Sequence, residues 1–164
     1  MKILPISSIN FNGKPKNFAT IDKFLSRSAQ PQIEDFIWLK DNGVTDVINF
    51  RTMYENNLGF EEKDVVESLG MKYHNIPSHT RHPNVENISK FFDTIANIIK
   101  NNGKAHIHCK AGADRTGMYA YLYKAKNNIG TSQENKEEWL NRGHHRELFP
   151  NLIEWTENFV NSWK

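Results

Sequence analysis

The sequence predicts an α/β fold, a three-layer sandwich in which helices flank a central, mostly parallel sheet of about four to five strands. Three observations favour this fold. Short apolar runs alternate with longer segments of helical periodicity. The run at 44–50 holds Val47, Ile48 and Phe50, a pattern typical of a parallel strand buried on both faces. A polar stretch containing glycine, 108–117, follows another short run, and open α/β sheets bind ligands at such positions.

Three strands and two helices are predicted in the first half of the chain. The strands cover 24–29, 44–50 and 71–76, and the helices cover 32–41 and 60–69. The first helix presents Ile33, Phe36 and Ile37 on one side. Asn42-Gly43 ends it, because such residues adopt the backbone conformation that closes a helix.

The second half begins with a long helix that Asn84 is placed to cap. Its apolar residues recur at a spacing of about 3.6 and include Ile88, Phe91, Ile95 and Ile98. A strand at 105–108 and a helix at 118–126 enclose the polar stretch. A capping box at 131–134 then opens a helix to 141, and a last helix begins at 150.

Length and composition predict a single domain, 1–164, with an N-terminal arm at 1–20 and C-terminal helices within 131–164. The net charge of +2 is too small to indicate a nucleic acid partner. We find no apolar run near the ~20 residues that a membrane span needs. The only cysteine, Cys109, cannot form an internal disulfide, so we expect a reducing, cytoplasmic setting. The oligomeric state stays open.

The polar stretch has the properties of a phosphate site. A loop between a strand and a helix aims backbone N–H groups at an anion, and the helix dipole assists. Arg115 adds a planar fork of donors, and Gly112 permits a turn that a Cβ would obstruct. The residues expected to bind the phosphate are Lys110, Ala111, Gly112, Ala113, Asp114 and Arg115.

Cys109 lies at the start of this loop, beneath the expected position of the phosphorus. The same amides and dipole favour the thiolate, so Cys109 is the predicted nucleophile and forms a cysteinyl-phosphate. Thr116 is placed to hydrogen-bond the sulfur when the intermediate is hydrolysed. The predicted catalytic residues are therefore Cys109, Arg115, Asp114 and Thr116, and we expect neither a metal nor another cofactor.

The motif His-Cys-x5-Arg-Thr-Gly at 108–117 resembles the signature of cysteine-dependent protein tyrosine and dual-specificity phosphatases. The segment 26–31, a helix and then 47–51 are similar to the N-terminal half of compact bacterial and fungal members. The resemblance covers roughly 20–125 and implies a phosphomonoesterase. It implies a phosphotyrosine protein as substrate, with an inositol phosphate or phosphoinositide as the alternative.

The proton donor for the leaving group is not determined by the motif. The resemblance implies an aspartate between the strand at 71–76 and the long helix, but 77–83 contains none. Asp114 is one candidate, because it is similar to the aspartate that some phosphoinositide phosphatases are thought to use. His79 and His82 are others, because imidazole titrates near neutral pH. A third alternative is an enzyme with no strong acid that prefers good leaving groups.

Other polar residues have two interpretations each. Lys110 is either solvated or a contact for a second phosphate, which would favour inositol phosphates. Arg51 either lines the pocket or pairs with Glu61 or Glu62. His108 is expected to support the loop.

Two further alternatives concern the histidine pair and the whole chain. The pair at 144–145 is expected to be part of a turn rather than a metal site. As a function of another class, a pseudophosphatase that binds phosphorylated ligands without turnover remains an alternative.

Overall fold

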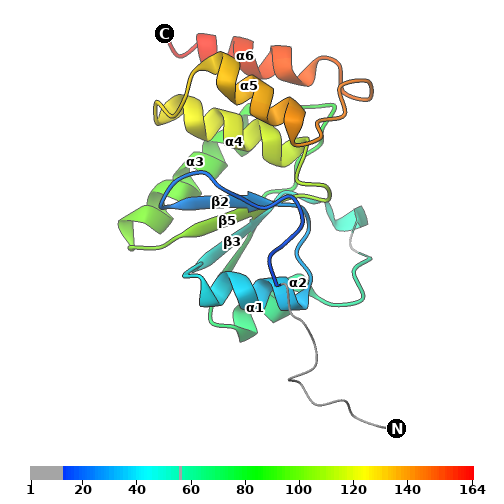
Figure 1. Cartoon of the computed structure of the whole chain (residues 1–164), viewed down its shortest axis with the longest axis vertical. Coiled ribbons are helices and arrows are strands. Elements are labelled where there is room, and N and C mark those ends of the chain that lie inside the picture. Colours follow the sequence, from blue (N-terminus) through cyan, green and yellow to red (C-terminus); the bar gives the residue numbers. More distant parts are fainter. Residues whose placement is uncertain (1–12, 56) are drawn as a thin grey trace, which may run out of the picture.

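The computed structural model describes residues 13–55 and 57–164 and confirms the predicted α/β class. Two helices, α1 (Ile33–Asp41) and α2 (Glu62–Ser68), cover one face of the sheet (Figure 1). The other face carries four helices, which are α3 (Val85–Lys100), α4 (Arg115–Lys126), α5 (Ser132–Asn141) and α6 (Leu152–Asn161). Of the predicted arm, residues 1–12 lie outside the described residues.

The sheet has five strands in the order β1-β2-β5-β3-β4. They are β1 (Ala19–Thr20), β2 (Leu25–Ser28), β3 (Asp46–Asn49), β4 (Lys72–Asn75) and β5 (Ala105–His108). Among the described strands, only β1 pairs antiparallel, and the other neighbours are parallel. In this register His108 lies beside Ser28 and Asn49, so the segments that follow β2, β3 and β5 leave the sheet at one edge.

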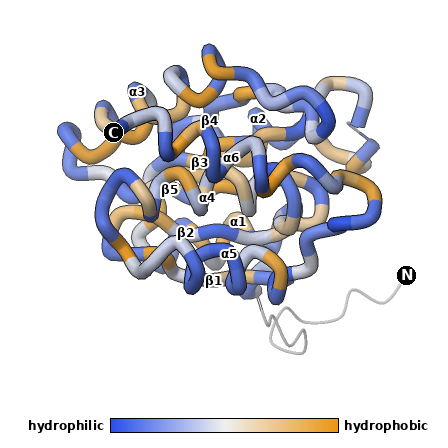
Figure 2. The backbone as a smooth tube through the Cα atoms, turned by 90° about the horizontal axis from the view of Figure 1, so that it is seen from above, coloured by the Kyte–Doolittle hydropathy of each residue, from blue (hydrophilic) through white to orange (hydrophobic). Residues whose placement is uncertain are grey.

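Two hydrophobic layers hold the sheet between its helices. The larger layer includes Phe50, Phe91 and Tyr119, and the Phe50 and Tyr119 rings stack at a centroid distance of 3.9 Å. The smaller layer lies under α1 and α2 and includes Phe36 and Val66. Hydrophobic residues recur among hydrophilic ones along α3, and Ile88, Phe91, Ile95 and Ile98 form its buried side, as in an amphipathic helix (Figure 2).

Two predicted helix caps are confirmed, whereas α4 and α6 begin at other residues than predicted, α6 at Leu152 instead of 150. Asn84 caps α3 by accepting hydrogen bonds from the N–H groups of Glu86 and Asn87. The capping box of α5 is also confirmed. Helix α4 begins at Arg115, three residues before the predicted start at 118, because the turn containing Thr116 and Gly117 is already helical. A short 3-10 helix, η2 (Met53–Glu55), follows β3 and was not predicted.

Candidate active site

The loop between β5 and α4 is anchored to the end of β2. Gly112 has a φ of +70°, and a Cβ there would lie 2.5 Å from the backbone of Ser28 and Ala29, so glycine is required. Arg27 donates a hydrogen bond of 2.8 Å to the carbonyl of Gly112. The N–H of Gln30 donates to the carbonyl of Lys110 at 3.0 Å. These contacts hold the loop in its curled form.

A pocket of about 450 Å³ opens above this loop. It brings together Cys109 and Arg115, which stand at the two ends of the loop. The other residues that line it are Thr52, Glu55, Ser78, His79, Thr80, Lys110, Ala111, Asp114, Leu148 and Phe149. Of the predicted binding residues, Gly112 and Ala113 are buried in the loop and do not line the pocket. A guanidinium, a thiol and a helix N-terminus around one space are suited to a phosphate group.

Arg115 is held by Glu55, a residue that the sequence interpretation did not select. Both terminal nitrogens of Arg115 donate to the Glu55 carboxylate, at 2.7 Å each. Thr52 donates two more hydrogen bonds to Glu55, from its N–H and its hydroxyl. Burial alone would raise the pKa of Glu55, but Arg115 and Thr52 outweigh it and lower that pKa to about 2. The carboxylate therefore stays ionised and fixes the guanidinium at the pocket.

His108 is buried at the start of the loop, and its Nδ1 lies 3.2 Å from the carbonyl oxygen of Cys109. Its Nε2 lies 2.8 Å from Oε2 of Glu62, and both residues are buried. Gln30 donates to the other oxygen of Glu62. Burial alone would raise the pKa of Glu62, but the charge and hydrogen bond of His108 lower it overall.

Asp114 contacts the two histidines that were expected to form only a turn. One carboxylate oxygen lies 2.8 Å from Nδ1 of His144 and accepts a hydrogen bond from the N–H of His145. The other oxygen lies 2.7 Å from Nδ1 of His145. Burial alone would raise the pKa of Asp114, but these hydrogen bonds lower it. The turn interpretation was therefore incomplete, because nothing in the local sequence indicates that 144–145 meets the loop at 109–114.

The candidate proton donors occupy different places. His79 lines the Cys109 pocket, whereas His82 lines a smaller neighbouring cavity. Asp114 lines the pocket as a carboxylate held by histidines. Thr116 is fully buried, and its hydroxyl makes no hydrogen bond to any described residue. In the described part of the chain, no group of three or more His, Cys, Asp or Glu is arranged to hold a metal ion.

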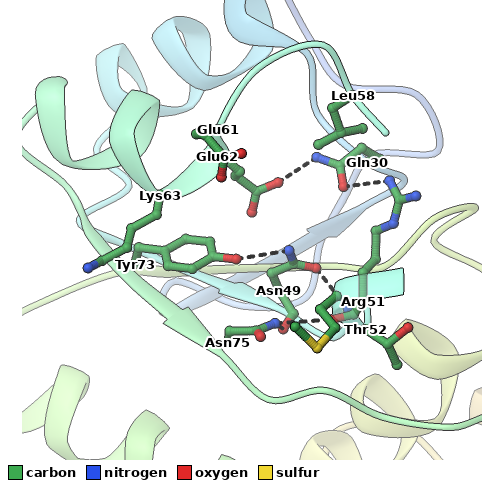
Figure 3. A pocket seen from close by; sticks show the side chains of 11 residues that line it. Gln30, Asn49, Arg51, Thr52, Leu58, Glu61, Glu62, Lys63, Tyr73 and Asn75 are labelled. Atoms are coloured by element: carbon green, nitrogen blue, oxygen red, sulfur yellow. Dashed lines mark hydrogen bonds between the residues drawn. The ribbon is translucent and has the colours of Figure 1, made fainter. Parts of the chain in front are cut away.

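Arg51 lies in a neighbouring pocket of about 200 Å³ and does not line the Cys109 pocket (Figure 3). Its guanidinium donates to Oε1 of Gln30 at 3.0 Å and to the carbonyl of Glu55 at 2.6 Å. Neither Glu61 nor Glu62 forms an ion pair with it among the described residues. Arg51 therefore supports the segment that carries Glu55, which neither of its two predicted roles described.

The mostly parallel sheet and the Cys109 loop together define a cysteine-dependent phosphatase of the protein tyrosine and dual-specificity superfamily, which confirms the resemblance seen in the sequence. Residues 23–126 match the family model described as "Polymorphic toxin system, DSP-PTPase phosphatase". This match spans more than half of the chain, and the chain belongs to that family.

Solved structures show the same fold. A DUF442 phosphatase from Shewanella putrefaciens is 24% identical with a TM-score of 0.76, over 96% of this chain and 97% of that one. TpbA from P. aeruginosa is 18% identical with a TM-score of 0.69, over 90% and 84%. The catalytic domain of the PP-IP phosphatase SIW14 from S. cerevisiae is 16% identical with a TM-score of 0.70, over 92% and 87%. A comparison with curated proteins finds no match.

Proposed function

We propose that this phosphatase removes phosphate from phosphotyrosine in proteins through a cysteinyl-phosphate intermediate. The observation that supports this most directly is the common pocket of Cys109 and Arg115, which are joined by a curled loop at the N-terminus of α4. Residues 1–164 form one catalytic domain in this proposal. We also place the enzyme in a reducing compartment such as the cytoplasm, because the only cysteine must stay a free thiol. Among the described helices, none is both long and apolar enough to span a bilayer.

The proposed reaction has two steps. In the first, the sulfur of Cys109 attacks phosphorus while Arg115 and the loop amides bind the non-bridging oxygens, and the tyrosine oxygen leaves with a proton. In the second, water attacks the phosphocysteine, and inorganic phosphate and the thiolate are formed. The buried hydroxyl of Thr116, which has no partner among the described residues, is available to hydrogen-bond the departing sulfur.

His79 is the proposed proton donor. It lines the pocket with Cys109 and lies in the segment after β4, where related phosphatases are expected to carry their acid. A neutral-pH donor must hold a proton before the reaction, and the lowered pKa of Asp114 makes that residue a poor source. His82 lines a separate cavity and is the weaker choice.

The pocket favours an aryl phosphate. Leu148 and Phe149 give it an apolar side against which a tyrosine ring can pack. Lys110 is the only lysine among the described residues that line it, and a highly phosphorylated inositol would need more unpaired cations. Inositol phosphates and phosphoinositides remain the second candidate. TpbA has been crystallised with pTyr, whereas SIW14 is a PP-IP phosphatase, so both substrate classes occur on this fold.

Phosphate release from a panel of substrates tests the proposal. The panel contains phosphotyrosine and phosphoserine peptides, inositol hexakisphosphate and phosphoinositides, without added metal. We expect the highest kcat/KM on phosphotyrosine peptides and complete loss in Cys109→Ser. Highest turnover of an inositol phosphate would select the second candidate. Binding of all substrates without turnover by the intact chain would instead identify a pseudophosphatase.

A further inference from the structure

Asp114 occupies the N-cap position of α4 but does not cap the helix. An aspartate at this position ordinarily accepts hydrogen bonds from the first free N–H groups of its helix. The Asp114 side chain makes no such bond with α4, whose residues are all described. Its carboxylate is turned instead to His144 and His145, which lie in the connection between α5 and α6.

This arrangement matters for the phosphate site that we propose. The free N–H groups at the start of α4 are among the donors that a phosphate would use. A carboxylate that capped them would compete with the substrate and repel its negative charge. The hydrogen bonds of 2.8, 2.8 and 2.7 Å from the histidine pair hold both carboxylate oxygens away from those donors.

The same contacts place part of the pocket wall. Leu148 and Phe149 follow the histidine pair within a few residues and line the Cys109 pocket. Arg81 also contacts this segment, by donating to the carbonyl of Leu148 at 3.0 Å and lying 5.2 Å from the centroid of the Phe149 ring. The segment is thus fastened at two points, one of which is Asp114.

We propose that His145, assisted by His144, is a positioning residue for dephosphorylation that holds the Asp114 carboxylate away from the phosphate-binding end of α4. This inference rests on the proposed function, because it concerns the same pocket. His145 is the better residue to change. Its side chain is 49% exposed, whereas the side chain of His144 is fully buried against Trp139.

The test measures phosphate affinity and turnover separately. His145→Ala is expected to raise KM for p-nitrophenyl phosphate and the inhibition constant of inorganic phosphate about 10-fold, as for the loss of one charge-assisted hydrogen bond, with kcat within about 3-fold of the parent. His145→Asn is expected to restore phosphate affinity, because its amide nitrogen can take the place of Nδ1.

A matched control comes from another histidine–aspartate pair. His74 lies 2.8 Å from Asp46, away from the pocket, so His74→Ala removes a similar contact and is expected to leave phosphate affinity unchanged. In an Asp114→Ala background, His145→Ala is expected to have no further effect on phosphate affinity, because its partner is gone. The proposal is overturned if His145→Ala weakens phosphate binding as much in the Asp114→Ala background as in the parent. It is also overturned if His145→Ala alone leaves phosphate affinity unchanged.

A binding experiment distinguishes failure of the positioning role from failure of the proposed function. Calorimetric binding of inorganic phosphate to the Cys109→Ser protein, with and without His145→Ala, needs no turnover. If phosphate release fails for every substrate but His145→Ala still weakens phosphate binding about 10-fold, the proposed function is wrong and the positioning role stands. If release succeeds and phosphate binding is insensitive to His145, the positioning role is wrong.

Discussion

Glu55 and Arg115 face each other at the pocket, joined by two hydrogen bonds of 2.7 Å. They are 60 positions apart in the chain and come from η2 and α4. A guanidinium has five donors, so a carboxylate can hold its terminal nitrogens while other donors remain for a ligand. The pair thus orients the phosphate-binding residue before a substrate arrives, which reduces the entropy that must be lost on binding.

Neutralising Glu55 should therefore lower catalytic efficiency. We expect Glu55→Gln to reduce kcat/KM on a phosphotyrosine peptide about 10-fold, because glutamine has only one acceptor oxygen, so one of the two hydrogen bonds is lost and Arg115 can take other orientations. Steady-state kinetics with the parent protein provide the measurement. Glu61→Gln is the matched control, since Glu61 lines only the neighbouring pocket, and its kcat/KM should stay within about 2-fold. Equal effects of the two substitutions would contradict the role of Glu55.

The same pair predicts how stability depends on pH. The pKa of Glu55 is lowered from 4.5 to about 2, so its ionised form contributes stability that is complete above 4.5 and is lost as the pH falls toward 2. Gln at this position does not titrate. The difference in unfolding free energy between the parent and Glu55→Gln should therefore be constant from pH 5 to 8 and shrink below 4.5. Denaturant unfolding across this range is the measurement, and a difference that grows on acidification would contradict it.

The sequence predicted the parts of the site that are local in the chain. Cys109 and Arg115 belong to one loop, so their spacing alone indicates that both can reach one phosphate. Glu55, His144 and His145 come from segments that no period or motif connects to this loop. They reach it because β3 neighbours β5 and because α5 and α6 pack on α4, and such pairings depend on tertiary packing.

The start of α4 shows why helix ends are harder to predict. Arg115, Thr116 and Gly117 belong to the signature and have no apolar spacing that marks a helix, yet they form its first turn. Gly117 is needed there for packing, because a Cβ would lie 2.1 Å from the indole nitrogen of Trp139 on α5. That constraint comes from a residue 22 positions away, and local propensity cannot reveal it.

The proposed role of His79 predicts a dependence on the leaving group. We expect His79→Asn to lower kcat on an alkyl phosphate about 100-fold, because an alkoxide needs a proton to depart. On p-nitrophenyl phosphate, whose leaving group is stable as an anion, the loss should be less than about 5-fold. Asp114→Asn should show no such selectivity. If Asp114→Asn is the selective variant, the proton comes from Asp114 instead.

Alanine substitutions at Gly112 and Gly43 distinguish two costs, the backbone strain of a positive φ and the steric clash of an added Cβ. Both Gly112 and Gly43 have positive φ, at +70° and +90°, so alanine strains the backbone by about 1 kcal/mol at either position. At Gly43 nothing lies within 4 Å of the new Cβ, whereas at Gly112 it meets the backbone of Ser28 and Ala29 at 2.5 Å. We expect Gly43→Ala to lose about 1 kcal/mol of unfolding free energy and Gly112→Ala roughly 3 kcal/mol or more, with loss of phosphate binding. Denaturant unfolding of the two variants measures the difference, and equal losses would show that the loop does not rest on the end of β2 as described.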